Sequence, residues 1–345
     1  MTRTLIQSII TLFSVVILVF ILFQWLGNPE QSMIGQTGDA KTIEQIRRNF
    51  HLDEPVWKRG IRYLNDVSLI GVYSKSEIEE KQIKGIFFGE QTQWGIKWPY
   101  LGISFLSKKK VSALLLDAFP ATLLLSITAM LIAIVFGITM GILCGYYKDK
   151  IWDRIFSFIS TLGISAPSFF MALLMAYVFG FVLHSYTGLD ITGSMYQLNE
   201  LTGEREINWS HLVLPAITLG IRPMSVITQL TRTTLIDIMH QDFIRTARAK
   251  GCNEWQVIVK HAVPNVIGPV IVTMTGWFAE LLAGAFFVEY IFGWNGMGRV
   301  TVNALDKMDF PVVMGAILFS ATIFIFINLL TDILMQRLDR RITTS

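Results

Sequence analysis

Long apolar runs alternate with polar segments along this chain. The runs approach or exceed the roughly 20 residues that an α-helix needs to cross a bilayer, and they hold little or no charge. They are Ile9–Leu26, Phe119–Tyr147, Ile155–His184, Leu212–Thr231, Pro264–Val288 and Phe310–Thr331. The pattern predicts six transmembrane helices and an all-α integral membrane protein. Prolines in or beside these runs, such as Pro167 and Pro223, are expected to kink the helices.

The first run is open to two interpretations, because Arg3 followed by an apolar stretch is typical of a signal peptide and of a membrane anchor. Gly27-Asn28-Pro29 offers no small-residue cleavage site of the Ala-x-Ala kind. We therefore interpret the run as a retained signal-anchor.

Composition agrees with a membrane protein. The 345 residues are 52% hydrophobic and only 16% charged, and the mean hydropathy is +0.50. A soluble domain is nearer a quarter charged. The net charge of +3 is too small to indicate a nucleic-acid partner.

Polar segments divide the chain. We expect a transmembrane segment over residues 1–27, an extracytoplasmic region with an insertion near 70–110 over 28–117, a five-helix core over 118–335, and a cytoplasmic tail over 336–345. The connection 148–154 is short and basic, so the positive-inside rule predicts that it is cytoplasmic. Alternation then puts both termini and the loop 233–264 on the cytoplasmic side of a bacterial inner membrane.

A charged stretch, residues 242–264, separates the fourth and fifth runs. Its periodicity predicts two short helices broken at Gly251, which can adopt the left-handed conformation that ends a helix. Asn253 is placed to cap the second helix, with Gln256 reaching back to it. Pro264 then marks the expected start of the next membrane segment.

This stretch resembles the Glu-Ala-Ala loop of permease subunits in binding-protein-dependent ABC importers. The version Arg-Thr-Ala-Arg-Ala-Lys-Gly at residues 245–251 is most similar to the dipeptide/oligopeptide branch, although Glu, Ile and Leu of the general form are replaced. Further runs resemble the same branch: Thr42–Phe50, His51–Pro55, Val288–Arg299 and Asp309–Val313.

The resemblance implies a type I importer permease that assembles with a second homologous permease, two ABC ATPase subunits and an extracytoplasmic solute-binding protein. It also implies that the loop docks on the ATPases. Asp242 and Arg245 would be contacts, Thr246 and Ala247 would permit close seating, and Gly251 would hold the bend. Arg248 belongs to the same coupling group. The alternative is that these cations are ordinary positive-inside charges near lipid headgroups.

Other chemistry finds no support in the sequence. No Gly-x-x-x-x-Gly-Lys-Ser/Thr run occurs, so the chain is not expected to be the ATPase, an enzyme or a cofactor-binding protein. The histidines never pair at i and i+4, and Cys144 and Cys252 have no metal-ligand spacing. We expect two free thiols and no metal.

Arg222 and Glu280 are charges inside apolar runs. A charge at the bilayer centre costs at least about 2.5 kcal/mol and usually faces the bundle interior or a wet cavity. Either the two line the substrate passage and receive a peptide's terminal charges, or they form a structural ion pair or an interface contact. The substrate is expected to be a di- or oligopeptide, with a nickel complex or glutathione as alternatives. A secondary transporter or a membrane receptor is the rival class.

Overall fold

The computed structural model describes residues 2–25, 54–198 and 205–338. The chain divides into two compact units, one formed by Met1–Ala118 with Val300–Thr322 and the other by Phe119–Arg299 with Ile323–Ser345. The predicted family-like segment Thr42–Phe50, and residues 51–53 after it, lie outside the described residues.

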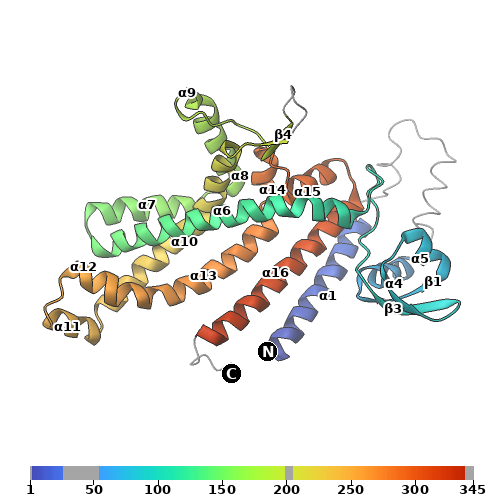
Figure 1. Cartoon of the computed structure of the whole chain (residues 1–345), viewed down its shortest axis with the longest axis horizontal. Coiled ribbons are helices and arrows are strands. Elements are labelled where there is room, and N and C mark those ends of the chain that lie inside the picture. The colour runs from blue at the N-terminus through green and yellow to red at the C-terminus, as the bar shows by residue number, and fades with distance from the viewer. Residues whose placement is uncertain (1, 26–53, 199–204, 339–345) are drawn as a thin grey trace. The chain divides into compact units, whose positions relative to one another are not determined.

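Helices make up most of the described chain (Figure 1). In chain order the elements are α1 (Thr2–Trp25), α4 (Val56–Val67), β1 (Ile70–Ser74), α5 (Lys75–Lys81), β2 (Gly85–Phe88), β3 (Thr92–Lys97), α6 (Val111–Tyr146), α7 (Ile151–Ser165), α8 (Ser168–Met175), the π-helix η2 (Ala176–Val182), α9 (His184–Thr187), β4 (Tyr196–Leu198), β5 (Arg205–Ile207), α10 (Ser210–Met239), α11 (Asp242–Ala249), α12 (Glu254–Gln256), the π-helix η3 (Val257–Ala262), α13 (Val263–Gly284), α14 (Phe286–Ile291), α15 (Met297–Asp306) and α16 (Phe310–Leu338).

Four helices are long and apolar enough to cross a membrane: Val111–Tyr146, Ser210–Met239, Glu254–Ala283 and Phe310–Ile333. A fifth candidate is the bent pair Ile151–Ser165 and Ser168–Val182. The apolar part of α1, Ile6–Leu22, is shorter than a full span. The described residues therefore hold up to five spans by this measure, so six spanning helices stay a prediction.

The helix predicted over Ile155–His184 is broken into two, because the direction of α8 differs from that of α7 by 113°. Ala166 and Pro167 are extended, with ψ angles of 131° and 138°. A residue before proline avoids the helical region, since the proline ring clashes with its backbone. Pro167 thus starts a new helix in a new direction, a sharper effect than the expected kink.

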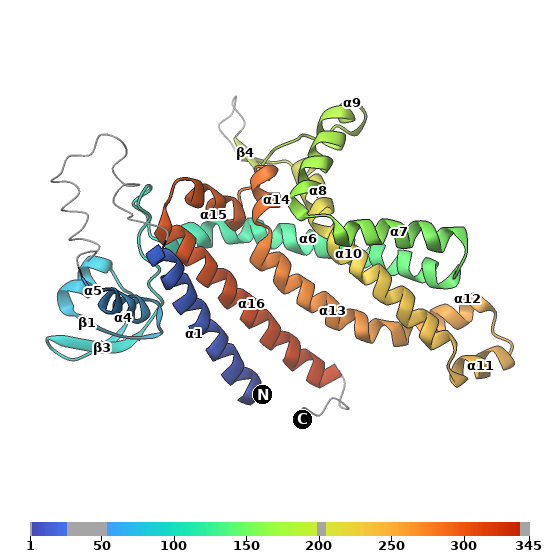
Figure 2. The ribbon, with the colours of Figure 1, turned by 180° about the vertical axis from the view of Figure 1, so that it is seen from behind.

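In the second unit, α10 lies alongside both α7 and α13 (Figures 1 and 2). It also approaches α6 closely, at the side where α6 carries a glycine at every fourth position, Gly137, Gly141 and Gly145. A Cβ atom at Gly141 would lie 2.5 Å from Cβ of Thr231 on α10. Real Cβ atoms do not approach that closely, so only glycines allow the helices this separation.

An ion pair joins α10 to α7. Arg232 donates from Nε and Nη2 to the two carboxylate oxygens of Asp153, at 2.6 and 2.7 Å. The carboxylate is almost fully buried and also accepts from the backbone N–H of Asp149. Both carboxylate oxygens therefore accept hydrogen bonds, which a buried carboxylate needs to offset the cost of its desolvation.

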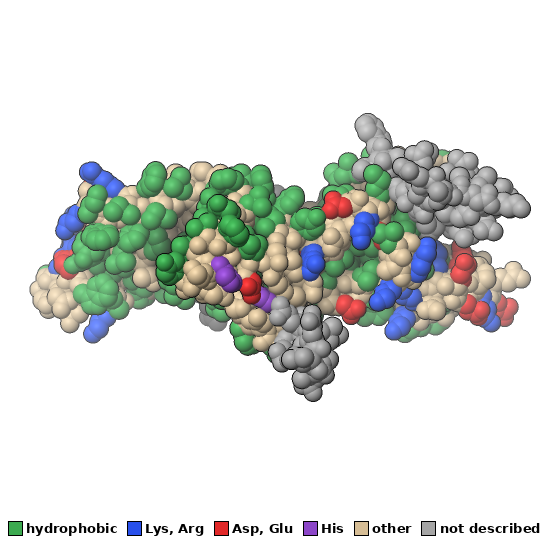
Figure 3. All heavy atoms as spheres, turned by 90° about the horizontal axis from the view of Figure 1, so that it is seen from above, with side chains coloured by type: hydrophobic (Ala, Val, Ile, Leu, Met, Phe, Trp, Pro, Cys, Tyr) green, Lys and Arg blue, Asp and Glu red, His purple; other side chains and the backbone are tan. Residues whose placement is uncertain are grey.

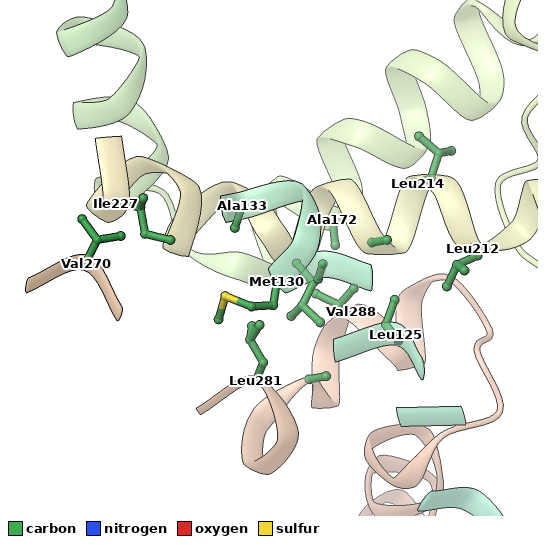
Figure 4. Packing of buried hydrophobic residues seen from close by; sticks show 14 of the residues in the cluster. Leu125, Met130, Ala133, Ala172, Leu212, Leu214, Ile227, Val270, Leu281 and Val288 are labelled. Atoms are coloured by element: carbon green, nitrogen blue, oxygen red, sulfur yellow. The ribbon is translucent and has the colours of Figure 1, made fainter. Parts of the chain in front are cut away.

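Apolar side chains of α6, α10, α13 and α14 form the core of this unit (Figure 4). Met130 of α6 reaches toward Leu281 of α13, and Ile227 of α10 faces Val270. All four are buried. The helices of the predicted membrane core therefore pack through a continuous apolar interior.

Glu289 on α14 is fully buried and lies beyond the end of the Glu254–Ala283 span. Its Oε2 accepts the backbone N–H groups of Gly298 and Arg299, at 2.6 and 3.4 Å, in the first turn of α15. Those N–H groups have no partner within their own helix. The carboxyl group thus caps α15, while burial raises its pKa to about 7.

The first unit contains a three-stranded antiparallel sheet in the order β1-β3-β2. A second, two-stranded sheet pairs β4 with β5 in the other unit. The all-α prediction therefore holds for most of the described chain but fails at the strands within residues 70–97 and at β4 and β5. In β3, Trp94 and Ile96 alternate with Gln93, Gly95 and Lys97, a strand pattern that the predicted insertion did not use.

The start of α6 and residues 300–322 pack together in the first unit, where Val111, Leu115, Val312 and Ala316 are buried against one another. Asp309 joins this cluster to the loop before α6 by accepting the backbone N–H of Phe105 at 2.9 Å and the Ser104 hydroxyl. Helix α6 begins at Val111, eight residues earlier than the apolar run that starts at Phe119.

Glu289→Gln should remove a pH dependence of stability. The folded-state pKa of about 7 lies above the ordinary value of 4.5, so the folded protein binds this proton more tightly than the unfolded chain. Stability is then lost as pH rises from about 4.5 to about 7, by up to roughly 3 kcal/mol. Unfolding in detergent between pH 4.5 and 8 measures the slope, with the exposed carboxylate of Asp237→Asn as control. Equal slopes in the wild type and Glu289→Gln would contradict this role.

Candidate functional site

Helix α11 and the turn after it form a compact projection between α10 and α13. Gln241 precedes the helix in an extended conformation, and the helix ends at Ala249. Gly251 follows with a φ of +84°, a left-handed conformation that costs a side-chain-bearing residue roughly 1–2 kcal/mol. The predicted break at Gly251 is confirmed.

Asn253 caps the next helix as predicted. Its Oδ1 accepts the backbone N–H of Gln256 at 2.8 Å, and Gln256 Oε1 accepts the backbone N–H of Asn253 at 3.1 Å. The helix does not end at Pro264, however, because Glu254–Ala283 is one continuous helix. The π-helix η3 ends at Ala262, two residues before Pro264, and changes the hydrogen-bond register close to the position where the proline lacks an N–H.

The two sides of α11 differ. Ile244 and Ala247 are buried in the core of the unit, whereas Asp242, Arg245 and Thr246 are exposed. Ala247 therefore packs against residues of its own chain. We had expected its small side chain to permit close contact with the ATPase subunits instead. Arg245 remains on the outer side, with only a 3.4 Å contact to the equally exposed Asp242.

Arg248 is engaged within the loop. Its Nε and Nη2 donate to Glu254 at 2.9 and 3.1 Å, which joins α11 to α12 across the Gly251 turn. Both side chains are about half exposed, so the pair contributes modestly. Sequence spacing could not reveal it, because the two residues meet only when Gly251 reverses the chain.

Two exposed aromatic residues, Phe243 and Trp255, flank the cationic side and were missed from the sequence. Large aromatic side chains often anchor protein interfaces. The sequence pattern that could have identified these two residues is the presence of large aromatic side chains in a mostly polar stretch.

Arg222 and Glu280 are exposed on neighbouring helices, α10 and α13. The Arg222 guanidinium lies over the Trp277 ring, 5.6 Å from its centroid. Glu280 lies three residues further along α13, on the same side as Trp277. Both residues belong to the described part of the chain, and no ion pair joins them there. A cation, an aromatic ring and a carboxylate thus share one side of the helix pair.

A separate cavity of about 510 Å³ lies between η2, α9 and the start of α10. His184, Asp190 and His211 are among its lining residues, and histidine and acidic side chains lie together on this face in Figure 3. Asp190 Oδ2 lies 3.0 Å from Nε2 of the buried His211. The ring's Nδ1 lies 3.0 Å from the Ser194 carbonyl oxygen. Among the described residues, no three or more His, Cys, Asp or Glu side chains are arranged so that they could hold a metal ion.

Comparison with protein families identifies the chain. A model of the binding-protein-dependent transport system inner membrane component matches residues 137–344, and the N-terminal model of the same kind of component matches residues 1–82. The chain belongs to this family of transport permeases.

Curated relatives of the permease span nearly its whole length. It is 31% identical over 338 residues to the glutathione transport system permease protein GsiC of Escherichia coli strain K12, covering 98% of this chain and 96% of that protein. GsiC of Shigella flexneri serotype 5b is 30% identical over the same coverage.

A solved structure is similar in fold. The MetNI methionine ABC transporter, in inward-facing conformations, matches with a TM-score of 0.50 at 16% identity, over 66% of this chain and 97% of that one. The protein is therefore a permease subunit of an ABC importer with the type I fold, and not an enzyme. Family membership implies ATPase subunits and a binding protein as partners.

Ala247→Phe should loosen α11, because a bulky side chain overpacks the contact that Ala247 and Ile244 make with the core. We expect a destabilisation of roughly 1–3 kcal/mol confined to this projection. Hydrogen exchange of residues 242–256 measures it. Ala249→Phe is the matched control, because Ala249 is exposed on the same helix. Equal protection in the two variants would refute the inward packing of Ala247.

Proposed function

We propose that this permease forms the translocation pathway for small peptides, and that separate ATPase subunits drive it through the loop 233–264. The continuous helix Glu254–Ala283 carries the proposal. It begins at the turn after α11 and bears Trp277 and Glu280 near its other end. With a rise of about 1.5 Å per residue, Gln256 and Glu280 are roughly 36 Å apart along it.

This connection supports a mechanical coupling. ATPase subunits bound to α11 would displace the turn at Gly251. The helix that starts at the Asn253 cap would transmit this displacement along α13. Asp242, Arg245 and Thr246 offer the exposed contacts, while the Arg248–Glu254 pair links α11 to α12. The loop and both termini would then face the cytoplasm, where ATP is available.

Arg222, Trp277 and Glu280 match the chemistry of a peptide. A guanidinium can receive a terminal carboxylate, and a carboxylate can receive a terminal ammonium group. The aromatic ring on the same side would contact an apolar side chain. A second homologous permease would close the other side of this passage, and the solute-binding protein would deliver the peptide from outside.

Glutathione is a specific candidate within this class, because the permease is similar to GsiC proteins over nearly its whole length. Glutathione is a small peptide with one ammonium group and two carboxylates, so the same pair of charges would suit it. Uptake assays with free peptides and glutathione decide between the substrates.

Arg245→Glu should weaken ATPase docking about tenfold, since reversing a charge at an interface costs on the order of 1.4 kcal/mol or more. We expect peptide uptake to fall while ATP hydrolysis loses its stimulation by the loaded binding protein. Both are measured in proteoliposomes of the full complex. Arg154→Glu, another exposed arginine on the predicted cytoplasmic side, is the control. Wild-type uptake by Arg245→Glu would count against docking at α11.

Glu280→Gln should lower the uptake of peptides with a free amino terminus about tenfold, as expected for losing one charged hydrogen bond, and leave N-acetylated peptides unaffected. Arg222→Gln should act in the same way on free carboxyl termini compared with peptide amides. Assembly with the ATPases should be unchanged. If each variant affects free and blocked peptides equally, the residues do not receive the terminal charges.

A further inference from the structure

Two of the three rows on the open face of the sheet β1-β3-β2 are apolar, and the third holds Ser74 and Thr92. Strand register aligns Ile70 with Ile96 and Ile86 in one row, and Val72 with Trp94 and Phe88 in the next. All six side chains are between 54% and 68% exposed. These six residues, named here the apolar sheet face, form a contiguous patch with no polar side chain in either row.

The covered face of the same sheet holds aromatic and polar groups together, with the rings of Tyr73 and Phe87 in contact. Helices α4 and α5 lie against it (Figure 2). Lys97 is buried there and donates from Nζ to the carbonyl oxygens of Asp66 and Ser68. Tyr73 donates its hydroxyl to Asp66 or to the Asn65 carbonyl oxygen on the same side. A sheet in water normally turns its more apolar face inward, so the six exposed apolar side chains favour apolar surroundings for the open face.

The sheet's helical layer is attached to α1, the apolar N-terminal helix of the same unit. Phe20 of α1 stacks on Tyr63 of α4, with ring centroids 5.8 Å apart. Phe20 comes five residues before the end of α1 at Trp25, which is a distance of roughly 8 Å along the helix. The sheet together with α4 and α5, called the subdomain below, therefore lies beside α1, close to the end of that helix at Trp25.

We propose that the apolar sheet face lies in the interfacial layer of the lipid bilayer, on the membrane surface at which α1 ends. Two observations favour lipid. The subdomain packs on α1 through Phe20 and Tyr63, and the apolar residues Ile10 and Leu18 of α1 are also exposed. Trp94, together with the 76% exposed Trp98 beside it, is the residue type enriched where bilayers meet water.

A transiently bound protein partner fits the apolar sheet face less well. Interfaces of that kind are about as polar as the rest of a protein surface, and the face would be left in water whenever the partner dissociated. The bilayer is always present. The sheet then acts as a membrane-surface anchor that fixes the subdomain, independently of which solute is carried or which side of the membrane it occupies.

Spin labels test the proposal in the full chain, purified with the subunits that it assembles with and placed in lipid nanodiscs. In a background of Cys144→Ala and Cys252→Ser, a nitroxide is attached at Ile96→Cys or Ile86→Cys. Ile10→Cys on α1 is the lipid control, and Glu79→Cys on the exposed side of α5 is the water control. Collision rates with oxygen and with a water-soluble nickel chelate are measured at each site.

We expect the labels at 96 and 86 to lose access to nickel and gain access to oxygen relative to the label at 79, as at position 10. Nickel access equal to that at position 79 would overturn the proposal, because the face would then lie in water. Exclusion of both reagents would overturn it as well, because a protein surface would then cover the face. Using two separate positions guards against a local effect of one substitution.

Discussion

The close approach of α10 to its neighbours is the contact on which the second unit depends. Gly137, Gly141 and Gly145 remove the side chains that would separate α6 from α10. On another side, Arg232 holds α7 through the buried carboxylate of Asp153. In apolar surroundings helices gain little from the hydrophobic effect, so dispersion at short range and satisfied polar pairs must hold them together. Any movement of α10 therefore carries α6 and α7 with it.

In the proposed mechanism, the helix Glu254–Ala283 passes movement of the loop to this group of helices. The capping box at Asn253 and the left-handed Gly251 fix the position at which the α11 projection joins that helix. Ile244 and Ala247 seat the projection on the chain itself, which leaves the cationic side of α11 available. The same helix ends near Trp277 and Glu280, so one element connects the proposed drive to the proposed passage.

The first unit is distinguished by its three-stranded sheet. Its sheet places a buried lysine on the covered face and six apolar side chains on the open one. These exposed apolar side chains, together with the stacking of Phe20 on Tyr63, are the basis for proposing a subdomain that lies at the surface of a bilayer.

Sequence alone determined the features that depend on neighbours along the chain. Apolar length predicted the long helices, Gly251 and Asn253 predicted the break and the cap, and the spaced motifs indicated the permease family. Pro167 signalled a kink, but not one of 113°. Tertiary structure decided the partners that meet only after the chain has folded: Glu254 for Arg248, Asp190 for His211, the first turn of α15 for Glu289, and Trp277 for Arg222. Local preferences act within a few residues, whereas these contacts depend on how whole helices pack, and no pattern of single positions records that geometry.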